Sequence, residues 1–347
     1  MPAAKRSGQK KVARRSDDAF ERLAEPFRRE IKLHCYRMLG TLHEAEDLVQ
    51  ETYIRAWRSF DRFQGGSFRA WLYKIATNAC LNALASRKSA NRWLPDALKP
   101  ATQEMPDGVP ATEVAWLEPY PDSELAGIAD EAPGPEARYT ADEAVQLAFV
   151  AAIQQLPPRQ RAALLLCDVL GWAAAEAATL LGGTLASINS ALQRARETLS
   201  RDNPRERLVA GAKPDPGQQQ LLDRYLRAWE NLDLTNFVTL LKEDATYTMP
   251  PLPQWYAGRE SIARFFQSAW KRYGGLRMVA TGANRQPAFA CYSRSIGSSA
   301  PWAAHSIHLL ALDGAAIRAL TLFVKPDGPR LFSAFGLPLT LTDDVAM

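Results

Sequence analysis

The chain has 347 residues and a mass of 38.4 kDa, which exceeds the usual size of one hydrophobic core and predicts two or three domains. It contains no run of about 18 apolar residues, and its N-terminus, MPAAKRSGQKKVARR, lacks the apolar stretch of a secretory signal. We therefore expect a cytoplasmic protein without a membrane segment. The four cysteines form no CxxC pair, which argues against a disulfide framework or a zinc site.

Charge is distributed unevenly along the chain. Residues 1–95 hold 19 Lys/Arg against 10 Asp/Glu, whereas residues 96–140 hold 2 against 10. Although the net charge of the whole chain is only +4, its N-terminal part is strongly basic and would attract a polyanion such as nucleic acid. The acidic stretch would either screen that surface or act as a solvated linker.

A helical block is expected over residues 17–93, after a disordered basic tail at 1–16. Apolar residues recur at three- and four-residue steps and give an apolar stripe. Along HEAEDLVQETYIRAWRSF this stripe comprises Leu48, Tyr53, Ile54 and Trp57. The sequence QGGS at 64–67 interrupts the pattern, and Ser67 is placed to cap the next helix.

That next helix has two faces of different character. One face carries the apolar residues Phe68, Leu72, Ile75 and Ala79, with Trp71 at its edge, and predicts core contacts. The opposite side carries Arg69, Tyr73, Thr77, Lys74 and Asn78. Exposed aromatic rings beside cations and amides suit single-stranded nucleic acid. Taken by themselves, these residues are explained more simply by a solvated polar face.

An acidic row precedes this helix. Glu44, Asp47 and Glu51 recur at three- and four-residue spacing beside Leu48. Because carboxylates repel DNA, we expect this row to meet a basic surface of a protein partner.

Two linkers and a second helical block follow. Residues 94–139 contain eight prolines and almost no basic charge, and they predict an acidic, loosely ordered linker. The block at 140–201 is interrupted by LPPRQ at 156–160 and by LLGGT at 180–184. Helix, short glycine-containing turn and helix form the pattern of a helix-turn-helix. Residues 202–217 predict a second linker.

Residues 218–347 have a different pattern of predicted elements. Two helical patterns and a third helix, RESIARFFQSAWKRY, precede four runs rich in strand-forming residues. Helices followed by a mostly antiparallel sheet predict an α+β domain.

The segments AEDLVQETYIRAWRSFDRFQGGSFRAWLYKIATNACLN and LPPRQRAALLLCDVLGWAAAEAATLLGGTLASINSALQRARETL resemble the two domains of bacterial RNA polymerase sigma factors of the extracytoplasmic-function (ECF) group. The resemblance implies a transcription initiation factor whose partners are core RNA polymerase and promoter DNA. It also implies a multidomain fold, with sigma region 2 at 17–93, sigma region 4 with its helix-turn-helix at 140–201, and a C-terminal α+β domain.

Site residues are carried over from the same resemblance. The polymerase contact would be formed by Asp47, Leu48, Gln50 and Glu51. The melted −10 element would be bound by Gly65, Gly66, Ser67, Lys74, Asn78, Asn82, Arg87 and Lys88. The −35 element would be read by Ser187, Asn189, Ser190, Gln193, Arg194 and Arg196. Members commonly carry basic residues where Asn189 and Ala191 stand, so we predict weaker −35 binding or an altered consensus.

Residues 218–347 resemble the SnoaL-like branch of the NTF2-like fold, in which a curved sheet wraps helices around a conical pocket. The residues that would line this pocket are Tyr247, Met249, Trp255, Tyr256, Trp270, His305 and His308. Two histidines three apart in a strand point to opposite faces unless a bulge intervenes. We therefore favour hydrogen-bonded structural histidines over a metal pair.

The resemblance implies a regulatory role for this domain, with a small molecule or a protein as the switch. The apolar residues near the C-terminus would either dock on the sigma domains or close their own domain; they are Leu331, Phe332, Phe335, Leu337 and Leu339. Both interpretations stay open at this point.

Two other functions also stay open. One is an autonomous helix-turn-helix regulator that binds duplex DNA without polymerase. The other is a fusion whose C-terminal domain is an isomerase- or cyclase-type enzyme acting on a small molecule. The sequence has no glycine-rich nucleotide loop and no metal-ligand spacing, so we expect no catalytic residue, cofactor or metal.

Overall fold

The structure is a computed structural model that describes residues 18–63, 65–87, 91–106, 108–128, 136–202 and 214–343. The chain divides into two compact units, each built from separate stretches of sequence. Unit 1 comprises Met1–Ala90, Glu124–Tyr139 and Leu156–Thr198. Unit 2 comprises Asn91–Ser123, Thr140–Gln155 and Leu199–Met347. The predicted basic tail and most of the second linker lie outside the described residues.

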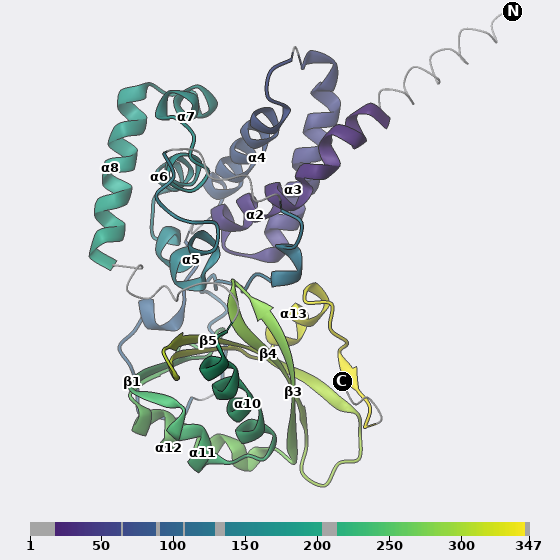
Figure 1. The fold of residues 1–347 in the computed structure, drawn as a ribbon, viewed down its shortest axis with the longest axis vertical. Coiled ribbons are helices and arrows are strands. Elements are labelled where there is room, and N and C mark those ends of the chain that lie inside the picture. Colours follow the sequence, from purple (N-terminus) through teal and green to yellow (C-terminus); the bar gives the residue numbers. More distant parts are fainter. Residues whose placement is uncertain are drawn as a thin grey trace, which may run out of the picture. The chain divides into compact units, whose positions relative to one another are not determined.

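Unit 1 is helical (Figure 1). Its main helices are α2 (Arg28–Leu39), α3 (Leu42–Ser59), α4 (Phe68–Ala85), α6 (Pro158–Leu164), α7 (Ala174–Leu181) and α8 (Leu185–Asp202). The helix ends lie at residues that commonly occupy such positions. Gly40 ends α2 with a φ of 77°. At the start of α4 the Ser67 hydroxyl accepts a hydrogen bond from the Ala70 amide at 3.1 Å.

The core of unit 1 forms where the apolar stripes of these helices meet. Helices α2, α3 and α4 pack against one another, and α6 packs against both α2 and α4. Ile31 on α2, Leu72 on α4 and Leu164 on α6 are completely buried. Regions far apart in the sequence therefore share one core.

Unit 2 is built on a seven-stranded sheet with the order β2-β1-β6-β5-β4-β3, and β7 pairs with the start of β5. The strands are β1 (Leu241–Thr248), β2 (Trp255–Ala257), β3 (Gly275–Ala283), β4 (Gln286–Arg294), β5 (Trp302–Asp313), β6 (Ala316–Phe323) and β7 (Thr340–Leu341). Strands β1 and β6 are parallel, and the other pairs are antiparallel. The α+β expectation for this part of the chain is confirmed.

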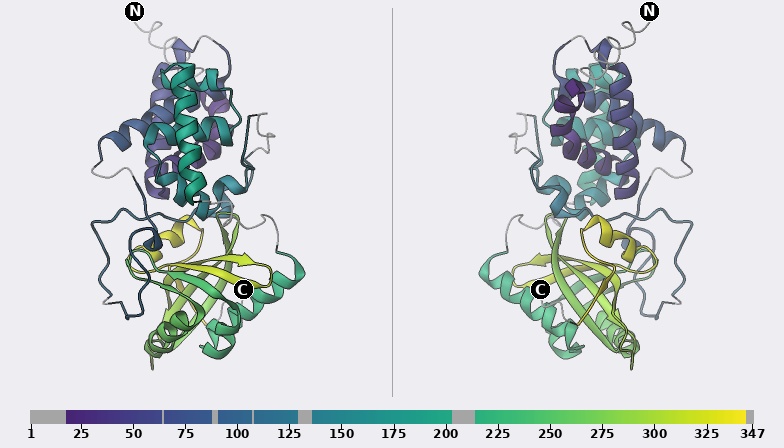
Figure 2. Two further views of the ribbon diagram at one scale, coloured as in Figure 1. Left: turned by 90° about the vertical axis from the view of Figure 1, so that its left-hand side faces the viewer. Right: turned by 90° about the vertical axis from the view of Figure 1, so that its right-hand side faces the viewer.

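Three helices cover one face of this curved sheet (Figures 1 and 2). They are α10 (Pro216–Glu230), α11 (Leu234–Thr239) and α12 (Arg259–Ala269). The core between helices and sheet is rich in aromatic rings, including Tyr225, Trp229 and Phe237. Rings of this size bury large apolar areas, which stabilises the helix layer on the sheet.

Residues 91–123, here called the strap, pack against the sheet domain instead of forming the loose linker predicted from their composition. The Trp255 indole donates to the Lys99 carbonyl at 2.6 Å, and the Tyr256 hydroxyl donates to the Glu104 carbonyl at 2.7 Å. The strap amide of Ala111 donates to the Pro251 carbonyl at 3.1 Å. Proline-rich composition misled the prediction because the partners of this segment lie about 150 residues away.

Helix α5 (Leu147–Gln154) also belongs to unit 2. Asn284, in the turn between β3 and β4, donates to the Val145 carbonyl at 2.7 Å and accepts from the Tyr120 amide at 2.8 Å. Gln286 accepts from the Leu147 amide at 3.1 Å. Both the strap and the start of α5 are thereby tied to one turn of the sheet.

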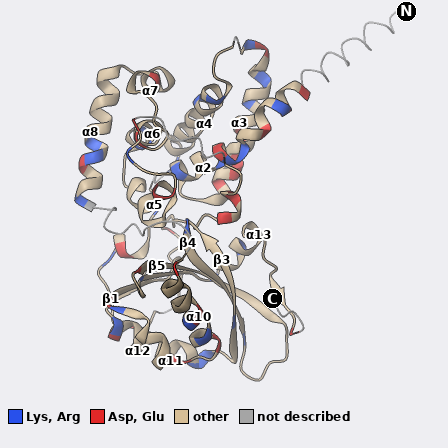
Figure 3. Ribbon diagram, in the orientation of Figure 1, with Lys and Arg blue, Asp and Glu red and all other residues tan. Residues whose placement is uncertain are grey.

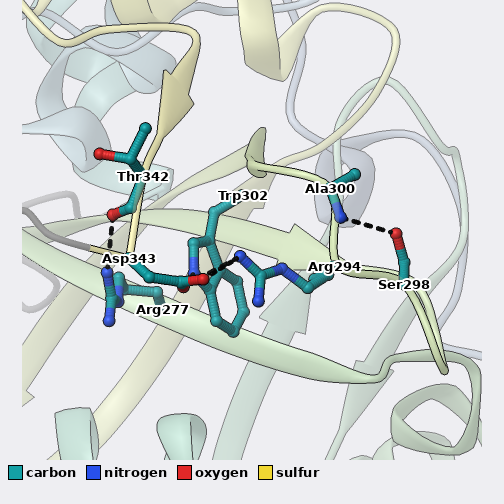
Figure 4. Close-up of polar contacts among 7 residues, drawn as sticks. All are labelled: Arg277, Arg294, Ser298, Ala300, Trp302, Thr342 and Asp343. Carbon is teal, nitrogen blue, oxygen red and sulfur yellow. Dashed lines mark hydrogen bonds and ion pairs between the residues drawn. The ribbon is translucent and has the colours of Figure 1, made fainter.

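Three of the five apolar residues near the C-terminus, Leu331, Phe332 and Phe335, are buried, as expected if this segment closes its own domain. Helix α13 (Gly328–Ala334) packs on β5, with Leu331 and Phe332 buried. Figure 4 shows how the following segment is fixed: Asp343 accepts from the Trp302 indole at 2.8 Å and from Arg294 at 2.9 Å. Leu337 is half-buried, and Leu339 is 54% exposed.

Candidate functional site

The predicted polymerase-binding residues lie on the outer side of α3. Asp47 and Gln50 are exposed, and Leu48 and Glu51 are half-buried. Helix periodicity places Ala45, Val49 and Ala56 on the opposite, buried side. Glu51 forms an ion pair with Arg55, and the ring of His43 lies 3.9 Å from Asp47.

Two residues of α3 that the sequence assigns to the apolar stripe are exposed instead. Ile54 is 49% exposed and Trp57 is 50% exposed. They lie about one and two turns beyond Glu51 along the same helix and line a groove of about 340 Å³ together with Phe20. Large exposed apolar residues beside the acidic row extend the surface that a protein partner could cover.

The predicted −10 residues lie in a row along α4 and in the turn that precedes this helix. Lys74, Asn78 and Asn82 are exposed and lie four residues apart, so they follow one line along α4. The turn before α4 contains Gly65 and Gly66 at φ 95° and 89°, a conformation that favours glycine. Arg87 is in an ion pair with Glu44 at 2.7 Å, and Lys88 lies outside the described residues.

The other polar row of α4 is buried, which corrects the expectation of an exposed aromatic surface. The Tyr73 hydroxyl donates to Glu30 at 2.7 Å, and Thr77 bonds the ring of His34 at 2.9 Å. Trp71, expected in the core, is half-buried against the ring of Phe68. The face differs because α4 packs on α2, α3, α6 and α7 together, which leaves only the Lys74 row open.

The predicted −35 residues lie on α8, the second helix of the helix-turn-helix. Gly182 ends α7 at φ 62°, and α8 starts where the Ser187 hydroxyl donates to the Thr184 carbonyl at 2.7 Å. The exposed members are Ser187, Asn189, Ser190, Gln193 and Arg194. Figure 3 shows the basic residues of α8 in its C-terminal half. Ala191 is 8% exposed, so this position adds no surface.

Arg196 has a different environment from the rest of this set. Its guanidinium makes two hydrogen bonds to Asp168, at 2.9 and 2.6 Å, and Asp168 is completely buried. A bidentate pair of this kind fixes the orientation of α8. The hydrogen bonds to Asp168 also raise the pKa of Arg196.

Unit 1 brings the −10 and −35 helices into one packed body. The buried side chain of Arg161 on α6 donates to the Met38 carbonyl at the end of α2 and to the Leu156 carbonyl at 3.2 Å. Tyr73 on α4 meets Trp172 edge-on, with ring centres 5.4 Å apart. The two predicted DNA-binding regions are therefore in direct contact.

Three family models match successive segments of the chain. Sigma-70 region 2 matches residues 23–90, sigma-70 region 4 matches 146–199, and a SnoaL-like domain matches 222–292. The chain is 42% identical over 342 residues to the ECF RNA polymerase sigma factor SigG of Mycobacterium tuberculosis, an alignment that covers 97% of this chain and 89% of that relative. The chain belongs to the ECF RNA polymerase sigma factors.

As an ECF sigma factor, the protein is a transcription initiation factor that binds core RNA polymerase and directs it to promoters, and the family is not enzymatic. The sigma factor SigJ of Mycobacterium tuberculosis is 29% identical over 256 residues, covering 72% of this chain and 73% of that relative. The crystal structure of SigJ matches 93% of this chain and 99% of its own with a TM-score of 0.59 at 23% identity. The resemblance inferred from the sequence and the fold class are confirmed.

The described residues of this sigma factor contain no helix long and apolar enough to cross a membrane. Within the same ranges, no group of three or more His, Cys, Asp or Glu side chains is arranged to hold a metal ion.

The SnoaL-like domain of this sigma factor contains a cavity of about 190 Å³. Of the predicted pocket residues, Tyr247, Met249, Trp270 and His305 line it. Trp255 instead lines a groove of about 620 Å³ beside α5, and Tyr256 and His308 lie behind lining residues, on Tyr247 and Trp229 respectively. Sequence analysis missed the strap residues Met105, Pro106 and Gly108, which line the cavity although no local pattern marks them.

A bulge lets both histidines of β5 serve one hydrogen-bonded chain. Ser306 pairs with Cys291 while Ala304 pairs with Tyr292, so His305 is the extra residue. The chain links Tyr273 to His305, His305 to Ser306, Ser306 to His308 and His308 to Tyr225, each at 2.8 or 2.9 Å. Burial lowers the pKa of His305 to about 4 and that of His308 well below its ordinary value, so both rings are neutral at pH 7.

Proposed function

We propose that this sigma factor recruits core RNA polymerase through the exposed side of α3 and binds the melted −10 strand with α4. The observation that carries the proposal is the pair of open surfaces on adjacent helices. Asp47 and Gln50 face solvent on α3, and Lys74, Asn78 and Asn82 form the open row on α4. Carboxylates suit a basic protein surface, whereas a cation and amides suit phosphates and base edges. Since polymerase and chromosome lie in the bacterial cytoplasm, we place its action there.

The −35 element is read by α8 in the major groove, as in other helix-turn-helix proteins. Asn189, Ser190 and Gln193 supply hydrogen-bonding groups for base edges, and Arg194 supplies a phosphate contact. Arg196 contributes indirectly, because its pair with Asp168 fixes the helix that carries the other residues.

Charge reversal on α3 tests the polymerase contact. We expect the double change Asp47→Lys and Glu51→Lys to weaken binding to core polymerase at least about tenfold, because both carboxylates become repulsive toward a basic partner surface. Binding is measured by fluorescence anisotropy with labelled full-length protein. Asp61→Lys, an exposed change of the same type outside this surface, is the control. Equal affinity of the double variant and the control contradicts the proposal.

We also propose that the packed state of unit 1 is a resting state that opens on the promoter. The −10 and −35 elements are about 25 base pairs apart, which corresponds to about 85 Å along B-form DNA. Helices in direct contact, as α4 is with α6 and α7, cannot reach both elements at once. Core polymerase would supply the binding energy that separates the two regions.

The SnoaL-like domain is proposed to modulate this opening through the strap and α5, the segments that join region 2 to the helix-turn-helix. Loosening the strap should make separation easier. We expect Trp255→Phe, which removes the hydrogen bond to the Lys99 carbonyl, to raise run-off transcription with core polymerase about twofold to fivefold. Trp302→Phe removes an indole hydrogen bond at the C-terminal segment and should change nothing. Unchanged transcription by the strap variant counts against this part of the proposal.

A further inference from the structure

The cavity in the SnoaL-like domain is bounded almost entirely by apolar side chains and aromatic rings. Phe265, Phe266 and Leu276 form part of its wall, and Met249 and Leu322 close the side toward the sheet. Its volume of about 190 Å³ is somewhat larger than the roughly 150 Å³ of a dry apolar cavity that accepts a benzene molecule. A single substituted aromatic ring matches this space.

Two hydrogen-bond donors in the wall of this cavity lack an acceptor. Trp229 is 3% exposed and Trp270 is 6% exposed, and both line the cavity. Their indole Nε1 atoms are buried and have no hydrogen-bond partner among the described residues. A buried N–H without a partner costs about 1–3 kcal/mol. An acceptor delivered by a ligand would remove this cost at either indole.

The other polar groups around the cavity are mostly hydrogen-bond donors or are already bonded. His305 bonds Tyr273 through Nε2 and Ser306 through Nδ1, so both of its ring nitrogens are already engaged. Arg272 and Lys325 also line the cavity and are donors. The described lining contains no Asp, Glu, Asn, Gln, Ser or Thr side chain. The side-chain oxygens of that lining are the hydroxyls of Tyr247 and Tyr273, and the hydroxyl of Tyr273 is already bonded to His305.

We propose that this cavity is a binding site for a small aromatic molecule that carries a carbonyl-type oxygen. The ring fills the space between Phe266 and the sheet, and the oxygen accepts from the indole of Trp270 or Trp229. This binding is independent of polymerase and DNA, so it goes beyond the proposed function. It would also account for the aromatic enrichment of the wall, since stacked and edge-on rings favour an aromatic ligand.

The strap takes part in the site because Met105, Pro106 and Gly108 line the cavity. The strap is held there by the hydrogen bond of Tyr256 to the Glu104 carbonyl and by that of the Thr102 amide to the Trp255 carbonyl at 2.9 Å. A bound molecule adds apolar contacts to this segment and should slow its opening. An effect of the ligand on transcription, through the same segment, rests on the proposed function.

Two probes of nearly identical shape test the hydrogen-bonding part of the proposal. Acetophenone carries a carbonyl oxygen on a benzene ring, and α-methylstyrene carries a CH₂ group in the same place. We expect the full-length protein to bind acetophenone about tenfold more tightly in calorimetric titration, which is the effect of one buried hydrogen bond. We also expect acetophenone to shift the indole N–H resonances of Trp229 or Trp270 in the NMR spectrum.

Variants separate the role of the indoles from the shape of the cavity. In the double variant Trp229→Phe and Trp270→Phe, the tenfold preference should disappear while α-methylstyrene still binds, which reports an intact cavity. Trp302→Phe removes an indole outside the cavity and should keep the preference. Amide hydrogen exchange at Thr102 and Ala111 should slow when acetophenone binds.

Four outcomes overturn the inference or one part of it. Equal affinity for both probes would show that no hydrogen bond to the ligand forms. Absence of acetophenone binding would show that the cavity is not a binding site for such a molecule. Shifts confined to other indoles place the molecule elsewhere. Unchanged exchange of the strap amides despite binding removes the strap from the site. A failure of Asp47→Lys and Glu51→Lys to weaken polymerase binding leaves all these measurements unaffected, so the two proposals fail separately.

Discussion

Three histidines in this protein are enclosed and neutral. Burial lowers the pKa of His34 to about 3 and that of His305 to about 4, and it lowers the pKa of His308 well below its ordinary value. Each ring nonetheless has hydrogen-bond partners: Thr77 for His34, Tyr273 and Ser306 for His305, and Ser306 and Tyr225 for His308. Buried polar rings of this kind are stable only while they stay uncharged.

Acid should therefore destabilise the fold. Below about pH 6.5 the unfolded chain binds a proton at each of these histidines, and the folded chain does not until the pH approaches the lowered pKa. The free energy of unfolding should fall by up to about 1.4 kcal/mol per pH unit per histidine between pH 6.5 and pH 4. Urea unfolding at several pH values measures this slope. His305→Gln removes one titrating ring and should flatten it, and an unchanged slope contradicts the assignment.

Two arginines two residues apart on α8 should respond differently to substitution. Arg196→Met leaves the buried Asp168 carboxylate with Arg138 at 4.0 Å, so we expect a loss of about 3 kcal/mol in unfolding free energy. Arg194 is exposed, and Arg194→Met should cost less than about 0.5 kcal/mol while weakening −35 binding. Thermal unfolding and DNA titration separate these effects. Similar stability losses in both variants would contradict the structural role of Arg196.

At the scale of the element, α8 carries no cation at the two positions where the family resemblance predicts one. Asn189 is exposed, and Ala191 is buried. Fewer cations mean fewer phosphate contacts and a weaker dependence of affinity on salt. The helix is nevertheless well anchored by the pair of Arg196 with Asp168.

Adding a cation to α8 should restore one phosphate contact. We expect Asn189→Lys to steepen the slope of log affinity against log salt by about 0.9 for −35 DNA, because one more counterion is released. Gln219→Lys adds the same charge to an exposed position on α10 and is the control. The prediction is wrong if both variants change the slope equally, since that result reflects net charge alone.

At the scale of the whole molecule, we propose that the contact between the two predicted DNA-binding regions in unit 1 must open before the promoter is bound. Arg161 is completely buried in this contact and donates to the Met38 and Leu156 carbonyls. Arg159 lies two residues away and donates to the Leu181 carbonyl, which belongs to the helix-turn-helix itself. Substituting these two arginines separately distinguishes an effect on the contact between the two regions from an effect on local stability.

Arg161→Met should shift unit 1 toward an open state, because two buried carbonyls lose their donor. Energy transfer between dyes at Arg58→Cys on α3 and Ala186→Cys on α8, both exposed positions, should decrease relative to the parent protein. Arg159→Met should lower the stability of the helix-turn-helix without this change. If energy transfer stays constant in the Arg161 variant, the contact does not depend on that side chain.

The sequence alone determined the order of the domains, the helix-turn-helix and the family, because these depend on local periodicity, caps and short motifs. It determined the row of Lys74, Asn78 and Asn82 for the same reason. Only the tertiary structure decided that Tyr73 and Thr77 are buried, that Ile54 is exposed, and that the strap lines a cavity. Those outcomes depend on which other elements cover a face, and helical spacing does not contain that information. His305 is an example of both. The spacing of the two histidines in the sequence showed that they could meet only if the strand contained a bulge, and the strand register shows that bulge.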